Sequence, residues 1–360
     1  NLKRLPNLDV LRFFLATLVL LFHLPQLSKN QGLPYFDELP IFHRGVEAVY
    51  MFFCLSGFLI IRLIYRAKLR NSFSIRDFYV RRILRIFPLY YLVLIFGFLF
   101  YNLFLPGVGI PFEIKYNLVE GILLCVFFLP NVFTNLYEPG GILEVLWSIG
   151  IEEQFYLFIA PLLFLIPTKR VLMALLIICG FYFFIFHIDT FYYLNKFQAV
   201  FFLLLSGGII AILEENKQLN FLKRSKLVPI IITMITMLFF VSDVFAFQQL
   251  WLTNLFLSIL FPLFIHSLAF NNFGFEIKIR WLNYFGNISY GIYMYHIIML
   301  NFAVFLFLKL HPEKILGDSL AIILLNALTL GLTLIVSHFS FQYFEKYFLK
   351  LKSKFRNDTN

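Results

Sequence analysis

Long apolar runs recur along nearly the whole chain of 360 residues. Each run is about 17 to 22 residues long, the length that an α-helix needs to cross a hydrocarbon core about 30 Å thick. With 61% hydrophobic and 14% charged residues, the chain is too apolar for a water-soluble domain of this size. The sequence therefore predicts an all-α polytopic membrane bundle of about ten transmembrane helices. They are expected at 8–25, 46–65, 83–104, 148–166, 171–187, 197–213, 228–246, 250–270, 288–308 and 319–341.

Basic residues between the apolar runs predict the orientation of the bundle. They gather at 67–85, 169–170, 217–226, 278–280 and 346–356. The positive-inside rule places these segments and both termini in the cytoplasm. A full crossing at the apolar segment 118–134 would reverse every later loop, so we interpret that segment as a re-entrant or interfacial helix on the outer face. The net charge of +10 then reflects topology, and we expect no nucleic-acid partner.

No soluble module separates the apolar runs. We expect a single membrane domain over residues 1–345, followed by a basic cytoplasmic tail at 346–360. Cys54, Cys125 and Cys179 lie singly inside apolar runs, so they are interpreted as small core residues and no metal site is expected. We find no internal repeat.

The first apolar run carries Asp9, Arg12 and His23, three residue types that are costly in lipid. An ionisable residue at membrane depth costs about 2.5 to 3.5 kcal/mol on insertion scales and is a functional hypothesis by default. Arg12 and His23 are about three helical turns apart, so they face the same side at levels separated by about 16 Å. The structural alternative is that Asp9 begins the helix, Arg12 snorkels and His23 lies at the interface. Both interpretations stay open from this run alone.

A second polar cluster, Trp147–Tyr156, opens the fourth predicted span with two adjacent carboxylates. The helix macrodipole favours acidic residues at a helix start, which explains one glutamate better than two. Neighbouring helical residues point about 100° apart, so at most one of Glu152 and Glu153 faces a given interior spot. Its predicted use is to orient or charge-stabilise the imidazole of His23. Further candidates for lining a cavity are Trp147, Ser148 and Tyr156.

Three arginines, Arg81, Arg82 and Arg85, lie at the inner end of the third span. An ordinary positive-inside flank explains them structurally. The functional alternative is a cationic platform for a polyphosphate, because their spacing makes them neighbours on a helix and arginine binds phosphate bidentately.

Two weaker segments lie at membrane depth. Phe52–Leu59 places Ser56 beside a glycine, which is typical of close helix packing. Asn287–His296 opens the ninth span with a polar and aromatic face that includes Tyr290. A hydrogen-bonded packing role is the simpler interpretation of His296, and lining the same cavity as His23 is the alternative.

Taken in order, these motifs resemble the acyltransferase-3 family of integral membrane acyltransferases, which includes bacterial O-antigen and other surface-polysaccharide O-acetylases. Leu8–Arg12 with His23 is similar to the family pattern of an arginine, ten residues and a histidine. The family's other motifs resemble 52–59, 81–88, 147–156 and 285–296.

The resemblance implies transfer of an acyl group, usually acetyl, from cytoplasmic acyl-CoA as co-substrate to a hydroxyl of a carbohydrate or glycolipid acceptor. It also implies a bacterial inner membrane and contact with membrane lipid. Arg81, Arg82 and Arg85 would hold the nucleotide and pyrophosphate, and the pantetheine arm would pass Arg12. His23 would act as general base, with an acyl-histidine relay as the alternative. We expect no appended hydrolase-like domain, so acceptor selectivity would reside in the helical core and outer loops.

A transporter or flippase for a lipid-linked sugar would also need a polar cavity in the membrane. The lack of visible repeats argues mildly against it. A receptor or structural subunit gives no reason for Arg12, His23 and Glu152 together. The sequence leaves the acyl chain, the acceptor, the pathway and the oligomeric state open.

Overall fold

The computed structural model of the chain describes residues 5–225, 227–271, 276–310 and 317–351. Within these ranges the chain is helical and contains no strand. Among the described residues, eight helical stretches are long and apolar enough to cross a membrane, and a ninth is bent by 81° at a short break. A further apolar helix, α13 (Leu227–Val241), has 15 residues. The predicted all-α membrane bundle is confirmed, and the count of about ten spans is reached only if the bent pair and α13 are included.

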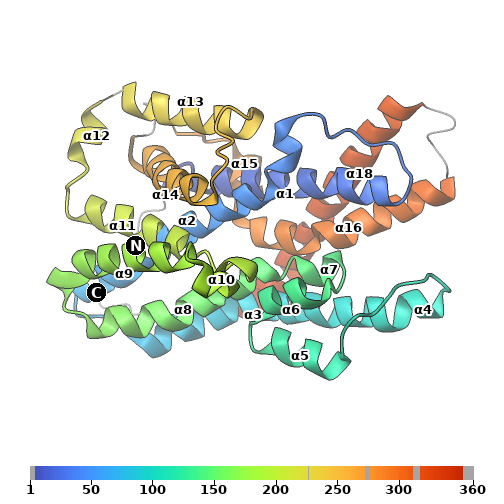
Figure 1. The fold of residues 1–360 in the computed structure, drawn as a ribbon, viewed down its shortest axis with the longest axis horizontal. Coiled ribbons are helices and arrows are strands. Elements are labelled where there is room, and N and C mark those ends of the chain that lie inside the picture. The colour runs from blue at the N-terminus through green and yellow to red at the C-terminus, as the bar shows by residue number, and fades with distance from the viewer. Residues whose placement is uncertain (1–4, 226, 272–275, 311–316, 352–360) are drawn as a thin grey trace. The chain divides into compact units, whose positions relative to one another are not determined.

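The eight stretches combine the following elements (Figure 1). They are α1 (Leu8–Asn30); α2 (Gly45–Leu69); α3 (Ile75–Leu99) with η2 (Phe100–Phe104) and α4 (Leu105–Gly107); α7 (Gly141–Glu144) with α8 (Trp147–Leu165); η3 (Thr168–Arg170) with α9 (Val171–Phe186); α14 (Leu250–His266) with η5 (Ser267–Asn271); α16 (Ser289–Leu310); and α18 (Asp318–Ser340) with η7 (Phe341–Glu345) and α19 (Lys346–Leu351). The bent pair is η4 (Asp189–Phe191) and α10 (Tyr192–Lys196) with α11 (Phe201–Glu215). The shorter elements are η1 (Pro40–His43), α5 (Leu118–Val126), α6 (Pro130–Tyr137), α12 (Asn220–Arg224) and α15 (Arg280–Asn287).

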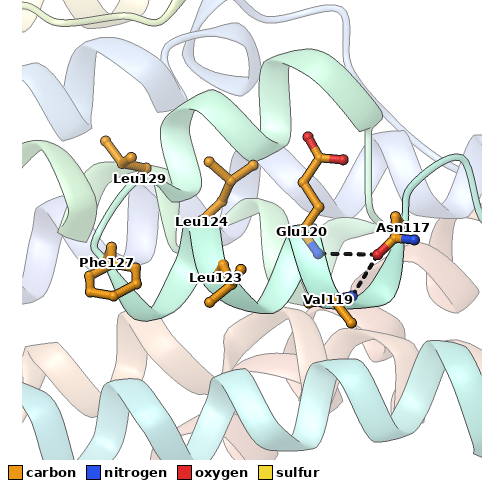
Figure 2. Close-up of a pocket in the computed structure, with 7 residues that line it drawn as sticks. All are labelled: Asn117, Val119, Glu120, Leu123, Leu124, Phe127 and Leu129. Carbon is orange, nitrogen blue, oxygen red and sulfur yellow. Dashed lines mark hydrogen bonds between the residues drawn. The ribbon is translucent and has the colours of Figure 1, made fainter.

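The segment predicted to be re-entrant or interfacial forms two short helices, α5 and α6. They have nine and eight residues, so at about 1.5 Å per residue neither crosses the hydrocarbon core. The side chain of Asn117 begins α5 by accepting the backbone N–H groups of Val119 and Glu120 (Figure 2). A shallow hollow of about 480 Å³ lies along α5, and Asn117 and Glu120 are its only polar lining residues. This hollow therefore offers neither a histidine nor a cation for catalysis.

The helices form two compact units. Unit 1 takes Asn1–Arg62 and Leu203–His338, and unit 2 takes Leu63–Phe202 and Phe339–Asn360. The single domain over 1–345 stays a prediction. Of the predicted tail, residues 352–360 lie outside the described residues, as do Lys226 of the basic segment 217–226 and residues 311–316.

Glycines bring helices of unit 1 into backbone contact. A Cβ atom on Gly57 of α2 would lie 1.8 Å from the carbonyl oxygen of Leu204 on α11, and one on Gly207 would lie 2.0 Å from the carbonyl oxygen of Cys54. Small residues allow this approach between membrane helices. The segment around Ser56 is therefore a close helix crossing.

The helices α1 and α15 of unit 1 pack equally closely. A Cβ atom on Gly286 would lie 1.7 Å from the carbonyl oxygen of Asp9. The ring of Phe13 stacks on Phe285 with centroids 5.5 Å apart. These contacts fix the turn of α1 that carries Asp9, while the next helix, α16, also faces α1 (Figure 1, blue and orange).

In unit 2, hydrogen bonds of side-chain amides fix the position of α8. The amide nitrogen of Gln154 donates to the carbonyl oxygen of Phe128 and to Oδ1 of Asn131, both at 2.8 Å. Asn131 in turn donates to the carbonyl oxygen of Phe197 at 2.9 Å. At the other end of α8, Nζ of Lys68 donates to three of the last carbonyl groups. The rotation of α8, and with it the direction of its glutamates, is thereby fixed.

Candidate active site

The predicted site residues divide into two sets, one in each unit. Unit 1 holds Asp9, Arg12 and His23 on α1, Ser56 on α2, and Tyr290 and His296 on α16. Unit 2 holds Arg81, Arg82 and Arg85 on α3, and Trp147, Ser148, Glu152, Glu153 and Tyr156 on α8.

In unit 1 the structure brings together two histidines, one from α1 and one from α16. Nδ1 of His23 lies 3.3 Å from Nε2 of His296, with ring centroids 5.1 Å apart. Nδ1 of His23 also lies 2.8 Å from the carbonyl oxygen of Val19, and Nδ1 of His296 faces the carbonyl oxygen of Tyr293. His296 is 1% exposed, whereas His23 keeps part of its surface accessible. Of the two imidazoles, His23 is thus the one that a reactant can reach.

Asp9 and Arg12 form an ion pair at the other end of α1. The distance between Oδ1 of Asp9 and the guanidinium is 2.8 Å, and the side chains are 7% and 22% exposed. Pairing offsets the cost of placing a guanidinium in an apolar helix. The structure therefore supplies Arg12 with a counter-charge on its own helix, about 16 Å below His23 along the helix axis.

The three arginines of unit 2 lie in different environments. Arg85 is exposed and Arg81 is half-buried. The guanidinium carbon of Arg82 lies 5.9 Å from the ring centroids of both Phe78 and Tyr156, and its Nε is buried without a hydrogen-bond partner among the described residues. Arg82 thus turns toward α8, while Arg85 faces outward.

The two adjacent glutamates of α8 also differ. Glu153 is buried, and its Oε1 finds no hydrogen-bond partner in the described part of the chain. Glu152 is half-buried and accepts a hydrogen bond of 2.7 Å from the hydroxyl of Tyr156. Both carboxylates lie within electrostatic range of Arg82. Orientation of His23 by one of these glutamates stays a prediction, because they belong to the other unit.

Sequence reasoning missed a further buried charged cluster in unit 1. The carboxylate of Glu214 accepts hydrogen bonds from Nζ of Lys223 and from the imidazole of His266, the latter at 2.8 Å. His266 is fully buried. The presence of a histidine inside the predicted span 250–270 was the available signal, since ionisable residues at membrane depth are uncommon. No group of three or more residues suited to a metal ion occurs among the described residues.

Comparison with known proteins places these clusters in a family. A family model described as an acyltransferase domain, Acyl_transf_3, matches residues 5–338. The chain belongs to the acyltransferase-3 family. The histidine pair, the Asp9–Arg12 pair, the arginines and the glutamates all lie within the matched residues.

Relatives of this acyltransferase-3 protein include named O-acetyltransferases. The peptidoglycan O-acetyltransferase OatA of Listeria monocytogenes is 30% identical over 178 residues, which cover 47% of this chain and 25% of the Listeria protein. The putative peptidoglycan O-acetyltransferase YrhL of Bacillus subtilis is 28% identical over 195 residues, covering 49% and 28%. The matches thus span about a quarter of the length of these two relatives.

A relative of similar length comes from a virus. The putative acetyltransferase ORF330 of Acidianus two-tailed virus is 27% identical over 302 residues, which cover 82% of this acyltransferase-3 chain and 83% of the viral protein. No solved structure matches the chain.

Proposed function

We propose that this protein transfers an acyl group, in the simplest case acetyl, from cytoplasmic acyl-CoA to a hydroxyl of a cell-surface carbohydrate or glycolipid. The observation that carries the proposal is the accessible imidazole of His23, backed by a buried histidine inside an acyltransferase-3 domain. The names of the Listeria and Bacillus relatives point to a polysaccharide-type acceptor. A bacterial inner membrane is the corresponding location.

In the proposed reaction His23 is the general base. The acceptor oxygen attacks the thioester carbonyl carbon while His23 removes the hydroxyl proton. The carbon–sulfur bond then breaks, and the proton passes from His23 to the leaving thiolate, giving an ester and free CoA thiol. General base catalysis by a placed histidine typically contributes about 10² to 10⁴-fold in rate.

The arginines of α3 suit the charged end of acyl-CoA. Arg81 and Arg85 lie one helical turn apart, and Arg85 is exposed, so both could meet a pyrophosphate group in bidentate geometry. Arg82 faces Tyr156 and Phe78, and we assign it to the less polar part of the donor.

The test uses purified protein in lipid nanodiscs with radiolabelled acetyl-CoA and soluble peptidoglycan fragments as acceptor probe. We expect saturable acetyl-CoA binding that weakens in Arg81→Ala/Arg85→Ala. We expect His23→Ala to keep binding but to lose about 10² to 10⁴-fold in release of CoA thiol. Retained turnover in a folded His23→Ala protein contradicts the assignment of His23.

The chain offers a matched control for each substitution. His187 ends α9, and its Nδ1 lies 2.7 Å from the carbonyl oxygen of Phe183, the same local contact that His23 makes with Val19. Arg76 is an exposed arginine on α3. His187→Ala and Arg76→Ala should therefore leave binding and turnover unchanged. Absence of any acetyl-CoA binding by the folded wild type would overturn the acyl-CoA donor and favour the transporter hypothesis.

A further inference from the structure

Both hydrogen-bonding contacts of His23 in unit 1 involve the same ring nitrogen, Nδ1. One contact is with the carbonyl oxygen of Val19 at 2.8 Å, and the other is with Nε2 of His296 at 3.3 Å. No corresponding contact is found for Nε2 of His23 within the described residues of this unit. The orientation of the His23 imidazole thus engages Nδ1 in hydrogen bonds and leaves Nε2 for contact with a reactant.

The partners decide which nitrogens carry protons. A carbonyl oxygen only accepts hydrogen bonds, so the nitrogen that faces it must be an N–H group. Nδ1 of His23 faces Val19, and Nδ1 of His296 faces Tyr293, so both are donors. A neutral imidazole has one donor and one acceptor nitrogen, so Nε2 of His296 is an acceptor.

A single arrangement satisfies every contact. His23 donates from Nδ1 to both the Val19 carbonyl oxygen and Nε2 of His296, as a bifurcated hydrogen bond. The reverse arrangement would place the lone pair of His23 Nδ1 against the oxygen of Val19 at 2.8 Å, which is repulsive. Nε2 of His23 is consequently left as an unprotonated acceptor.

We propose that His296 is a positioning residue, which holds His23 in the tautomer that presents an unprotonated Nε2 to the acceptor hydroxyl. This inference rests on the proposed function. When Nε2 takes the hydroxyl proton, His23 becomes an imidazolium, and its Nδ1–H bond to His296 becomes charge-assisted and stronger. The proton taken by Nε2 then leaves to the thiolate sulfur, while the Nδ1 proton stays in place throughout.

The burial of the two rings matches this division of roles. His296 is 1% exposed and its Nδ1 is engaged with the Tyr293 carbonyl oxygen, so it is fixed and screened from reactants. His23 keeps part of its surface accessible. In hydrolases with a catalytic triad, a buried carboxylate selects the tautomer of the histidine in the same way. Here a second imidazole occupies the place of that carboxylate.

The first test measures which imidazole nitrogens are protonated, and it does not depend on activity. Nitrogen-15 spectra of histidine-labelled protein in nanodiscs should show protonated Nδ1 and unprotonated Nε2 on both rings. A scalar coupling should connect Nδ1 of His23 with Nε2 of His296 across the hydrogen bond. His187, whose Nδ1 also faces a carbonyl oxygen, serves as the internal reference for the tautomer. A protonated Nε2 on neutral His23, or the absence of the coupling, overturns the inference.

The second test uses two amide substitutions that imitate different ring nitrogens. The amide of glutamine reaches the place of Nε2, so His296→Gln keeps an acceptor for His23. The shorter amide of His296→Asn reaches only the place of Nδ1. It can still donate to the Tyr293 carbonyl oxygen, but it offers no acceptor to His23. We expect His296→Asn to lower kcat about 10- to 100-fold, as loss of a supporting partner does, with the KM for acetyl-CoA unchanged. His296→Gln should restore most of the turnover.

The outcomes separate this inference from the proposed function. A wild type without transferase activity would refute the function, while the spectra would still decide the hydrogen bond. Turnover that is lost in His23→Ala but intact in His296→Asn would leave the function standing and overturn the role of His296. Equal loss in His296→Asn and His296→Gln, with KM rising in both, would show a purely structural role and also overturn it.

Discussion

Substitution of Gly57 by alanine tests the close crossing of α2 and α11 in unit 1. The added Cβ would lie 1.8 Å from the carbonyl oxygen of Leu204, an atom that belongs to the backbone of α11 and cannot rotate away. Real Cβ atoms do not approach heavy atoms closer than 3.0 Å, so α2 and α11 must separate by more than 1 Å. Overpacking typically costs about 1 to 3 kcal/mol, and a backbone clash belongs at the upper end of that range. We therefore expect Gly57→Ala to lower the free energy of unfolding by about 3 kcal/mol.

Two further variants make this measurement specific. Gly331 on α18 has no atom within 4 Å of its added Cβ, so Gly331→Ala should be neutral or stabilise by about 0.5 to 1 kcal/mol. Gly207→Ala meets the carbonyl oxygen of Cys54 at 2.0 Å in the same crossing. Once the helices have separated, the second clash is partly relieved, so the double variant should be more stable than the sum of the single effects by about 0.5 to 3 kcal/mol.

The assay is a titration of the protein from mild detergent into sodium dodecyl sulfate, followed by circular dichroism. Comparison of the midpoints gives the change in the free energy of unfolding for each variant. If Gly57→Ala unfolds at the same midpoint as Gly331→Ala, the two helices do not meet at Gly57 and the reasoning is refuted.

Three other predictions follow from single contacts. Lys68→Met should lower the free energy of unfolding by about 1.5 to 3 kcal/mol in the same titration, because Nζ donates to the last carbonyl groups of α8; an unchanged midpoint would contradict this. Glu214→Leu should lower the free energy of unfolding by about 3 to 5 kcal/mol, since it leaves Lys223 and His266 without their shared carboxylate. Glu214→Gln, which keeps an oxygen acceptor, should cost less, and a larger loss in Glu214→Gln would contradict this reasoning. Arg85→Ala should raise the KM for acetyl-CoA with kcat unchanged, because the proposed function gives this exposed arginine a role in binding the phosphates alone; initial rates that fall through kcat alone would exclude this role.

The fold class could be predicted from the sequence because the length of an apolar run is enough to identify a membrane helix. Helix ends were less predictable. The first helix was expected to end at residue 25 but runs through Pro25 to Asn30, since a proline inside a helix loses only one backbone hydrogen bond. The third helix begins at Ile75 rather than 83, where the side chain of Ser74 caps it by accepting the N–H of Asp77.

A bend between two apolar helices could not be predicted from hydrophobicity. The predicted span 197–213 begins in a break, because the chain turns by 81° between α10, which ends at Lys196, and α11, which begins at Phe201. Gln198 adopts a positive φ of 53° in that break. Since glutamine is not a residue that marks such a conformation, nothing in the apolar pattern announces the turn.

Contacts between residues far apart in the chain could not be predicted from the sequence. Arg12 and His23 were expected to share a helix face, a local property of one helix. The contact between His23 and His296 joins residues 273 positions apart, and it depends on how α16 packs against α1. The cluster around Glu214 was missed for the same reason, because its histidine lies 52 positions away on another helix.

The sequence distance between the two histidines has a consequence for the biosynthesis of the protein. His296 leaves the ribosome 273 residues after His23. At about 5 to 20 residues per second, the delay amounts to tens of seconds. During that interval the nascent chain has its reactive imidazole but lacks the residue that would orient it. On our inference, a chain truncated before α16 would carry an unoriented base, so full activity would arise only once α16 had been made.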